Sequence, residues 1–505
     1  MTNPLYDELF GVHADSTAPF LRLLGGETIS HAAFLANAAR LANALASLGV
    51  GPGERVAVQV DKSPDALALY AACVRTGAVF LPLNTAYTVE ELRYFIEDSE
   101  AALVVCAEAK AKDLAPIVAG LGAGLETLNA DGSGSLTDMA KDQPDTFQTV
   151  PRKDSDLAAF LYTSGTTGRS KGAMLTQANL LSNARTLVEV WQFTQDDILL
   201  HALPIFHTHG LFVATNVALV SGGSMIFMPK FDIDAVFAHL PDATALMGVP
   251  TFYTRLLSDA RLTRDAAAHM RLFISGSAPL LAETHTAFQA RTGHLILERY
   301  GMTETNMNTS NPYRGDRRPG TVGVPLPGVE VKITDPASGA ELSSDEVGQI
   351  EVKGPNVFRG YWKMPEKTAE ELRGNGFFIT GDLGKIDADG YLHIVGRNKD
   401  LIISGGYNIY PKEIELLLDT QPGVAESAVI GVPHPDFGET VLGLLVAKGS
   451  QTPDLDACMQ SVKGELARFK HPRQLIVIDE LPRNTMGKVQ KNTLRERYKD
   501  LFVHA

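Results

Sequence analysis

The chain has 505 residues, of which 45% are apolar and 21% are charged, and its formal net charge is −14 at pH 7. This length exceeds what one hydrophobic core usually serves, so we expect at least two domains. An acidic chain without a lysine- or arginine-rich block is a poor partner for nucleic acid or an anionic membrane, and we expect neither as a partner.

No feature of the sequence indicates export or membrane insertion. Residues 1–11 lack the basic and apolar regions of a signal peptide. The most apolar stretch, residues 66–83, is interrupted by an arginine and is too short to cross a bilayer. Cys73, Cys106 and Cys458 stand far apart in apolar or helical surroundings, which favours buried thiols over a disulfide or a zinc site. We therefore expect a cytoplasmic protein.

Helix and strand patterns alternate along the first half of the chain. Apolar residues recur at helical spacing over 31–49 and 64–77, whereas the short apolar runs at 55–60 and 101–107 predict strands. Residues 121–155 are rich in Gly, Asp, Ser and Thr and predict a loop region. The alternation resumes with strands over 197–204, 224–229, 244–250, 270–276 and 295–301 and a helix near 209–221. Such alternation indicates parallel sheets with right-handed crossovers.

The predicted pattern of helices and strands changes from about residue 320. Short strands separated by Gly, Asp and Asn turns are predicted over 329–335, 348–354, 377–387 and 391–397. After Arg397 the pattern becomes α+β, with a helix from Lys412, another near 456–468, and strands between and after them. We place a domain boundary there, which gives an N-terminal domain of residues 1–396 and a C-terminal domain of residues 397–505.

Residues 162–173, YTSGTTGRSKGA, form the densest run of glycine and hydroxyl residues in the chain. An apolar strand precedes the run, and we expect a helix over about 176–191 to follow it. Glycines bring backbone N–H groups close to phosphate oxygens, hydroxyls add donors, and Lys171 adds positive charge. The Walker A pattern GxxxxGK[ST] is absent from the sequence, so this is a phosphate loop of another kind.

The loop resembles the signature of the adenylate-forming superfamily, which includes acyl-CoA synthetases, luciferases and peptide-synthetase adenylation domains. Four further motifs of that superfamily follow in order: YGMTET at 300–305, TGDLG at 380–384, GRNKDLIISGGYNIYPKEIE at 396–415 and PRNTMGKVQK at 482–491. The resemblance implies an α/β fold with a large N-terminal domain of α/β sheets plus a β-barrel-like part, and a small, mobile α+β C-terminal domain. It also implies a two-step reaction, in which a carboxylate attacks the α-phosphate of ATP and a thiol then displaces AMP.

The resemblance assigns most of the nucleotide site to the large domain. The loop residues that would hold the β- and γ-phosphates are Thr163, Ser164, Gly165, Thr166, Thr167, Gly168 and Lys171. Thr303 and Glu304 match positions near the α-phosphate, with Glu304 as the Mg²⁺ ligand. Tyr300 would stack on adenine, opposite a wall that includes Ser277 and Ala278. Glu298 is also predicted to belong to the nucleotide site.

The remaining motif residues lie near the predicted domain boundary and the C terminus. Asp382 would accept hydrogen bonds from both ribose hydroxyls, and Arg397 matches an arginine that also reaches the ribose. Lys399 matches the hinge about which the small domain rotates. Lys488 would neutralise the charge that develops between the carboxylate and the α-phosphate. Among the residues that would face the pantetheine arm of coenzyme A are Gly405 and Gly406.

Arg299 indicates which kind of acid is the substrate. A buried arginine is costly unless it pairs with an anion, so an arginine beside the YGMTE motif suggests a second carboxylate on the acid. His207 matches a histidine at the entrance of the acyl pocket, and Ser277 would also contact the acid. When longer stretches of the sequence are compared, the chain resembles the malonate-activating branch of the superfamily. The polar run 306–312 also fits a short polar acid. Malonate, with methylmalonate as a further candidate, is therefore the predicted acid, and ATP, Mg²⁺ and coenzyme A are the predicted cofactors and co-substrates.

Several alternatives remain open. Arg299 could instead form a structural ion pair with Glu298 or Glu304, and His207 could be a core histidine. The enzyme could load a carrier protein, or it could activate another small acid, an aryl acid or a medium-chain acid. The chain could also be a non-catalytic nucleotide-binding relative, although its key motif residues are all present. A lysine acetyltransferase and a deacetylase are predicted partners that would act on Lys488, because acetylation deletes its charge.

Overall fold

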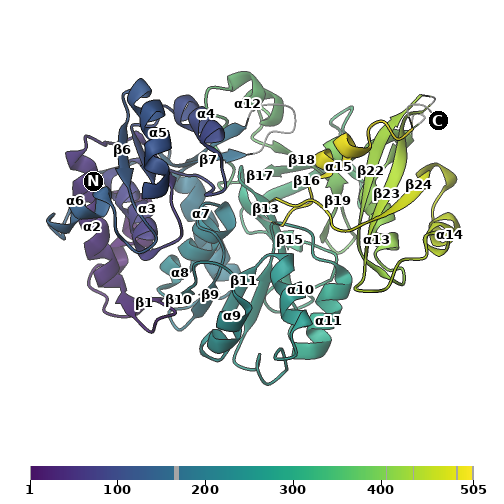
Figure 1. The fold of residues 1–505 in the computed structure, drawn as a ribbon, viewed down its shortest axis with the longest axis horizontal. Coiled ribbons are helices and arrows are strands. Elements are labelled where there is room, and N and C mark those ends of the chain that lie inside the picture. The colour runs from purple at the N-terminus through teal and green to yellow at the C-terminus, as the bar shows by residue number, and fades with distance from the viewer. Residues whose placement is uncertain (1, 164–169, 405–406, 436, 485–486, 503–505) are drawn as a thin grey trace. The chain divides into compact units, whose positions relative to one another are not determined.

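In the computed structural model, the chain divides into two compact units (Figure 1). The first unit comprises Met1–Glu330 and Val352–Phe378, and the second comprises Val331–Glu351 and Ile379–Ala505. The structure describes residues 2–163, 170–404, 407–435, 437–484 and 487–502.

A six-stranded sheet forms one half of the first unit. Its order is β6-β5-β3-β4-β7-β8, and every neighbouring pair except β7 and β8 is parallel. Its strands are β3 (Arg55–Gln59), β4 (Val79–Pro82), β5 (Leu103–Cys106), β6 (Gly124–Thr127), β7 (Leu157–Thr163) and β8 (Lys171–Thr176). The helices between them are α3 (Pro64–Thr76), α4 (Val89–Ser99), α5 (Glu108–Leu121) and α6 (Ser135–Lys141), and α2 (His31–Ser47) precedes β3. The parallel alternation predicted for this region is confirmed.

The prediction of a loop over 121–155 is wrong in part. The edge strand β6 and the helix α6 lie within it. Every residue of β6 is only partly buried, so the strand lacks the apolar run that marks its neighbours. The fully buried strand β5 shows how strong that signal is elsewhere in the same sheet.

The glycine-rich run joins two antiparallel strands, β7 and β8. We predicted a strand followed directly by a helix, but β8 comes before α7 (Gln177–Val190). Gly172 packs so closely on the ring of Phe160 that an added Cβ would lie 2.2 Å from it. Thr176 then caps α7, because its hydroxyl accepts a hydrogen bond from the Asn179 N–H. Thr163 and Lys171 are paired at the end of the hairpin where the glycine-rich run joins the two strands.

A nine-stranded sheet forms the other half of the first unit, in the order β15-β14-β13-β12-β11-β9-β10-β1-β2. Strands β1, β10, β9, β11, β12 and β13 are parallel, and β2, β14 and β15 pair antiparallel at the two edges. The strand bounds are β1 (Pro19–Arg22), β2 (Thr28–Ser30), β9 (Ile198–His201), β10 (Ser224–Phe227), β11 (Ala245–Gly248), β12 (Leu272–Ser275), β13 (Leu297–Met302), β14 (Asn306–Ser310) and β15 (Val324–Pro325). The helices of this half are α8 (Asn216–Ser221), α9 (Ile233–His239), α10 (Pro250–Ser258) and α11 (Ala282–Thr292), with a π-helical turn over His209–Thr215. The short helix α1 (Pro4–Leu9) opens the chain.

The second unit contains most of one sheet and all of another. One has the order β16-β17-β18-β19, with strands β16 (Glu330–Thr334), β17 (Gly348–Lys353), β18 (Phe378–Ile386) and β19 (Leu392–Arg397). The other is built on the antiparallel pair β22 (Val424–His434) and β23 (Gly438–Ala447), with β20 (Ile402–Ser404), β21 (Tyr407–Ile409) and β24 (Gln474–Ile478) beside it. The helices are α13 (Pro411–Leu418), α14 (Leu455–Glu465) and α15 (Lys491–Tyr498), whereas α12 (Pro365–Glu371) belongs to the first unit.

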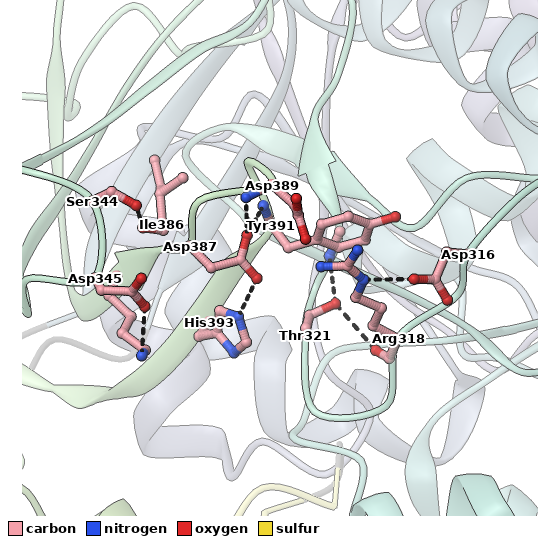
Figure 2. Close-up of polar contacts among 12 residues, drawn as sticks. Asp316, Arg318, Thr321, Ser344, Asp345, Ile386, Asp387, Asp389, Tyr391 and His393 are labelled. Atoms are coloured by element: carbon pink, nitrogen blue, oxygen red, sulfur yellow. Dashed lines mark hydrogen bonds and ion pairs between the residues drawn. The ribbon is translucent and has the colours of Figure 1, made fainter.

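A tight turn closes the β18–β19 hairpin (Figure 2). The Asp387 carboxylate accepts hydrogen bonds from the backbone N–H groups of Asp389, at 3.0 Å, and Tyr391, at 2.9 Å. Its other oxygen lies 3.0 Å from Nε2 of His393. The turn sets the register of the two strands, which brings Asp382 opposite Arg397.

Cys73, Cys106 and Cys458 are all buried free thiols, as predicted. Burial raises the pKa of the Cys106 thiol to about 11, so this thiol is protonated at neutral pH. Within the described residues, no helix combines the length and the apolar character needed to cross a bilayer.

Candidate active site

The carboxyl ends of the parallel strands of the nine-stranded sheet carry several of the predicted residues. The segment after β9 contains His207, the segment after β12 contains Ser277 and Ala278, and β13 itself contains Arg299 and Tyr300. Ligands of open α/β sheets bind at this edge, because the loops that follow parallel strands meet there. The topology therefore gathers residues that lie almost 100 positions apart in the sequence.

Arg299 is buried, with 4% of its surface exposed. Its Nε and Nη2 atoms have no hydrogen-bond partner, and no carboxylate among the described residues pairs with it. Burial lowers the pKa of the guanidinium to about 9, and the nearby Tyr253 hydroxyl only partly opposes this effect. An unpaired buried cation of this kind is a strong site for an anion, since the anion would remove much of the cost of burying the charge.

The two carboxylates that could have paired with Arg299 have other partners. Glu298 lies 3.5 Å from Nδ1 of the buried His285 on α11, and burial raises its pKa. Glu304 accepts a hydrogen bond from the Tyr361 hydroxyl at 3.0 Å. The described part of the chain therefore shows no structural ion pair for Arg299, and Glu298 is buried next to His285 of α11.

The charge of Arg299 acts on His209, and His209 in turn contacts Ser277 and His207. The Nδ1 atom of His209 is 3.1 Å from the Ser277 hydroxyl, and Ser277 adopts a left-handed backbone conformation with φ of 72°. Burial lowers the pKa of His209 well below its ordinary value, and the charge of Arg299 adds to the effect. His207 is half-buried, and its Nδ1 lies 3.4 Å from the backbone N–H of His209. His209 itself is buried, and its Nε2 has no hydrogen-bond partner in the described structure.

We predicted the polar run 306–312 to fit a short polar acid, but two of its hydroxyls have hydrogen-bond partners within the protein. Ser310 accepts a hydrogen bond from the indole of Trp191 at 2.9 Å, and Thr309 donates to the carbonyl of Val322 at 2.7 Å. These two hydroxyls are therefore used inside the protein. Asn306 differs, because both ends of its buried amide lack hydrogen-bond partners in the described structure, and its φ is 49°.

The turn after β13 places Glu304 in a network that the sequence motifs did not reveal. Glu304 is 4% exposed, and Tyr361 is 2% exposed. The Tyr361 hydroxyl also lies 2.6 Å from Oε2 of Glu371 at the end of α12. Lys171 lies 3.0 Å from both oxygens of that same carboxylate. Tyr300 and Thr303, the other predicted nucleotide residues of this segment, are half-buried.

The rest of the glycine-rich run, Ser164, Gly165, Thr166, Thr167 and Gly168, lies outside the described residues, and so do Gly405 and Gly406. Thr163 is described, and its hydroxyl lies 3.5 Å from the carbonyl oxygen of Lys171 across the hairpin. The predicted roles of these residues stay predictions.

Asp382 and Arg397 form a cross-strand pair in the second unit. Nε of Arg397 lies 2.6 Å from Oδ1 of Asp382, and the Asp382 side chain is only 6% exposed. The backbone of Asp382 is fixed on both sides, since its N–H donates to Thr380 and its carbonyl accepts from Gln349. The pair therefore offers a rigid carboxylate and an arginine at one place on the hairpin.

Lys488 lies close to this pair within the second unit. Its pKa is lowered to about 8, first by desolvation and then by the positive charge of Arg397, whereas Asp382 opposes the shift. The residue still has exposed surface, so the ammonium is crowded by protein atoms without being sealed from water. Its backbone is held by a turn in which Asn484 accepts from the Lys488 N–H at 3.0 Å. The exposed Lys399 also contributes to lowering the pKa of Lys488.

Both parts of the chain match models of known protein families. Residues 11–362 match the AMP-binding enzyme family, and residues 413–488 match the AMP-binding enzyme C-terminal domain. The chain is 35% identical to the malonate–CoA ligase of Arabidopsis thaliana over 88% of this chain and 78% of that protein. It is 37% identical to a feruloyl-CoA synthase of Amycolatopsis over 94% of this chain and 95% of that protein. The crystal structure of ATP-bound MatB from Rhodopseudomonas palustris superposes with a TM-score of 0.98 at 59% identity, covering 99% of this chain and all of that one.

Proposed function

The chain belongs to the AMP-binding enzyme family, and we propose that it joins malonate to coenzyme A in an ATP-dependent reaction. The reaction passes through an acyl-adenylate and releases AMP and pyrophosphate. The fold is the adenylate-forming fold that the motifs implied, with a large N-terminal part and a smaller C-terminal part. The similarity to malonate–CoA ligase and to ATP-bound MatB supports both the reaction and the acid.

The observation that carries the choice of acid is the unpaired, buried guanidinium of Arg299. Malonate has one carboxylate to be activated and a second that is only one carbon away. Arginine can bind that second carboxylate through two parallel N–H bonds. His207 and Ser277 lie on the neighbouring segments and are the proposed further contacts of the acid.

In the first step, an oxygen of the other malonate carboxylate attacks the α-phosphate of ATP, and pyrophosphate leaves. Two anions must approach each other, so fixed cations and donors near the reacting atoms lower the barrier. We assign Lys171 and the hydroxyls of the glycine-rich loop to the β- and γ-phosphates, Thr303 to the α-phosphate, and Lys488 to the charge that develops between the two reactants. We propose that the adenine side of the nucleotide contacts Tyr300, Ala278 and Glu298. The ribose would be held by Asp382 and Arg397.

Glu304 is the proposed protein ligand for Mg²⁺. Mg²⁺ prefers oxygen ligands and usually binds through one or two carboxylates together with phosphate oxygens and water. A buried carboxylate whose Oε1 atom is fixed by the Tyr361 hydroxyl fits that requirement. The bound metal would supply charge stabilisation for the departing pyrophosphate.

In the second step, the coenzyme A thiol attacks the acyl carbon and expels AMP. We propose that the small domain, residues 397–505, rotates about Lys399 between the steps, so that Lys488 leaves and residues near Gly405 and Gly406 face the pantetheine arm. A carrier-protein thiol is the alternative acceptor. It would use the same chemistry, so comparing coenzyme A with a carrier phosphopantetheine separates the two.

The experiment that tests the acid is AMP formation with ATP, Mg²⁺ and coenzyme A across malonate, methylmalonate, succinate, acetate, butyrate, octanoate and ferulate. Ferulate is included because of the similarity to feruloyl-CoA synthase. We expect malonate to lead and Arg299→Met to lose that preference. If a monocarboxylate or ferulate leads with the wild-type protein, the proposed acid is wrong although the adenylate chemistry stands.

Two further proposals concern the setting of the enzyme. Acetylation of Lys488 would delete its charge and stop the first step, so an acetyltransferase and a deacetylase are proposed regulators. Quantitative acetylation at Lys488 with retained malonyl-AMP formation would exclude this. We also propose a cytoplasmic location, because the three buried free thiols suit a reducing compartment.

A further inference from the structure

Lys171, at the end of the glycine-rich run, is held by two residues from the segment 352–378. Its Nζ lies 3.0 Å from both carboxylate oxygens of Glu371 and 4.1 Å from the ring centroid of Tyr361. Both charged side chains are mostly buried, with 17% of Lys171 and 21% of Glu371 exposed. A free lysine side chain samples many rotamers, and these contacts hold it in a single position.

The same two residues reach Glu304. The Tyr361 hydroxyl lies 2.6 Å from Oε2 of Glu371 and 3.0 Å from Oε1 of Glu304. The two carboxylates share the single hydroxyl hydrogen of Tyr361, which connects the carboxylate proposed to bind Mg²⁺ to the carboxylate that holds Lys171. Outer contacts of this kind orient metal ligands, and their loss typically weakens metal binding or activity 10- to 100-fold.

The positive charge of Lys171 is only partly neutralised by Glu371, so Lys171 can still bind an anionic ligand. Lys367 also contacts the Glu371 carboxylate, at 3.1 Å. Two ammonium groups and one hydroxyl therefore share a single negative charge. Burial opposes ionisation of Glu371, but the hydrogen bonds from Tyr361 and Lys171 outweigh it and lower the pKa of the carboxyl. Glu371 thus stays negative and fixes Lys171 without cancelling its charge fully.

We infer that Glu371 and Tyr361 are positioning residues for the β- and γ-phosphates of ATP. They fix Lys171 and the Glu304 carboxylate relative to each other before the nucleotide arrives, so that little reorganisation accompanies binding. This inference rests on the proposed function, because it assumes that Lys171 binds the phosphates that AMP lacks. The residues act through Lys171 and Glu304 and need not touch the nucleotide themselves.

The test compares the affinities of ATP and AMP, both in the presence of Mg²⁺, measured by calorimetry on the full-length protein. Glu371→Gln should weaken ATP binding about tenfold and leave AMP binding within about twofold, and Tyr361→Phe should shift ATP in the same direction. Glu370→Gln is the matched control, since Glu370 is the adjacent residue and contacts Lys367 at 2.7 Å instead of Lys171. Conversion of preformed malonyl-AMP to malonyl-CoA should be unchanged in Glu371→Gln.

Equal losses of ATP and AMP affinity in Glu371→Gln would show a merely structural role and overturn the inference. ATP binding as tight as that of the wild type in Glu371→Gln, or the same loss of ATP affinity in Glu370→Gln, would also overturn it. Failure of the proposed function is a separate outcome, because the wild-type protein itself would then form no malonyl-AMP.

Discussion

At the scale of single residues, each unit holds a cation in surroundings that disfavour its charge. Arg299 is buried without a carboxylate partner in the described structure, and Lys488 sits among Arg397 and Lys399. Each arrangement costs stability in the free protein, because a buried or crowded cation loses hydration. Each is relieved when an anion binds, which is how binding sites for anionic substrates are commonly built.

The first prediction concerns Lys488 and pH. The ammonium is present below its pKa of about 8 and is lost as the pH rises through that value. If the charge is needed for attack on the α-phosphate, kcat/KM for malonyl-AMP formation should fall about tenfold per pH unit above 8. Stopped-flow measurement of pyrophosphate release from pH 6.5 to 9.5 gives the profile.

Lys488→Ala should reduce malonyl-AMP formation by on the order of 100-fold or more and remove the inflection near pH 8. Thioester formation from preformed malonyl-AMP should change far less. Lys463→Ala, which removes an exposed lysine from α14 in the same unit, is the control. Equal losses in both half-reactions of Lys488→Ala would show that our assignment of Lys488 is wrong.

At the scale of elements, the segments that follow the strands place the side chains. Gly276, directly after β12, lies against the guanidinium of Arg299, and an added Cβ would be 2.3 Å from its Cζ. The absent side chain at this position therefore makes room for the cation. The antiparallel β18–β19 hairpin performs a similar task in the second unit, where its register pairs Asp382 with Arg397.

The second prediction is that Gly276→Ala changes acid binding without changing nucleotide binding. The clash falls on the flexible end of Arg299, so the fold should survive while the guanidinium moves by about 1 Å or more. Misplacement of that size typically costs on the order of 10- to 100-fold, so kcat/KM for malonate should fall by that amount while KM for ATP stays within about twofold. Gly464→Ala, where an added Cβ meets nothing within 4 Å, is the control. Parallel losses for ATP and malonate would contradict this role of Gly276.

Much of this element pattern could be predicted from the sequence, and the failures have physical causes. The buried parallel strands are short apolar runs, and all of those we predicted in the first unit exist. Strand β8 was missed because it continues directly from the glycine-rich run into α7, and β6 because it is only partly buried. Among site residues, Tyr361 and Glu371 were missed because their importance comes from contacts with Lys171, 190 and 200 positions away. No local pattern reports such contacts.

At the scale of the whole molecule, the two steps of the proposed reaction use different nucleophiles. The malonate carboxylate attacks in the first step, and the coenzyme A thiol attacks in the second. Malonyl-AMP formation needs Lys488, Asp382 and Arg397 near the nucleotide in our proposal, and thioester formation needs space for the thiol. Motion of the small domain would meet both needs, and lid motions of this kind often limit turnover.

The third prediction tests this motion at Lys399. Proline fixes φ, so Lys399→Pro should restrict rotation at this point of the backbone. We expect malonyl-AMP formation within about threefold of wild type and thioester formation slowed at least about tenfold, measured separately in single-turnover experiments. Lys399→Ala controls for loss of the side-chain charge. If proline and alanine slow the same step equally, the effect belongs to the charge, and the hinge assignment is wrong.

Activation of malonate as an acyl-adenylate can be followed directly with an oxygen label. The enzyme would be given malonate labelled with ¹⁸O in both carboxylates, together with unlabelled ATP, Mg²⁺ and coenzyme A, and the products would be analysed by mass spectrometry. Because a carboxylate oxygen attacks the α-phosphate and stays there when the thiol expels AMP, each AMP should carry one ¹⁸O atom. Unlabelled AMP, or ADP with the label in inorganic phosphate, would contradict activation as an acyl-adenylate.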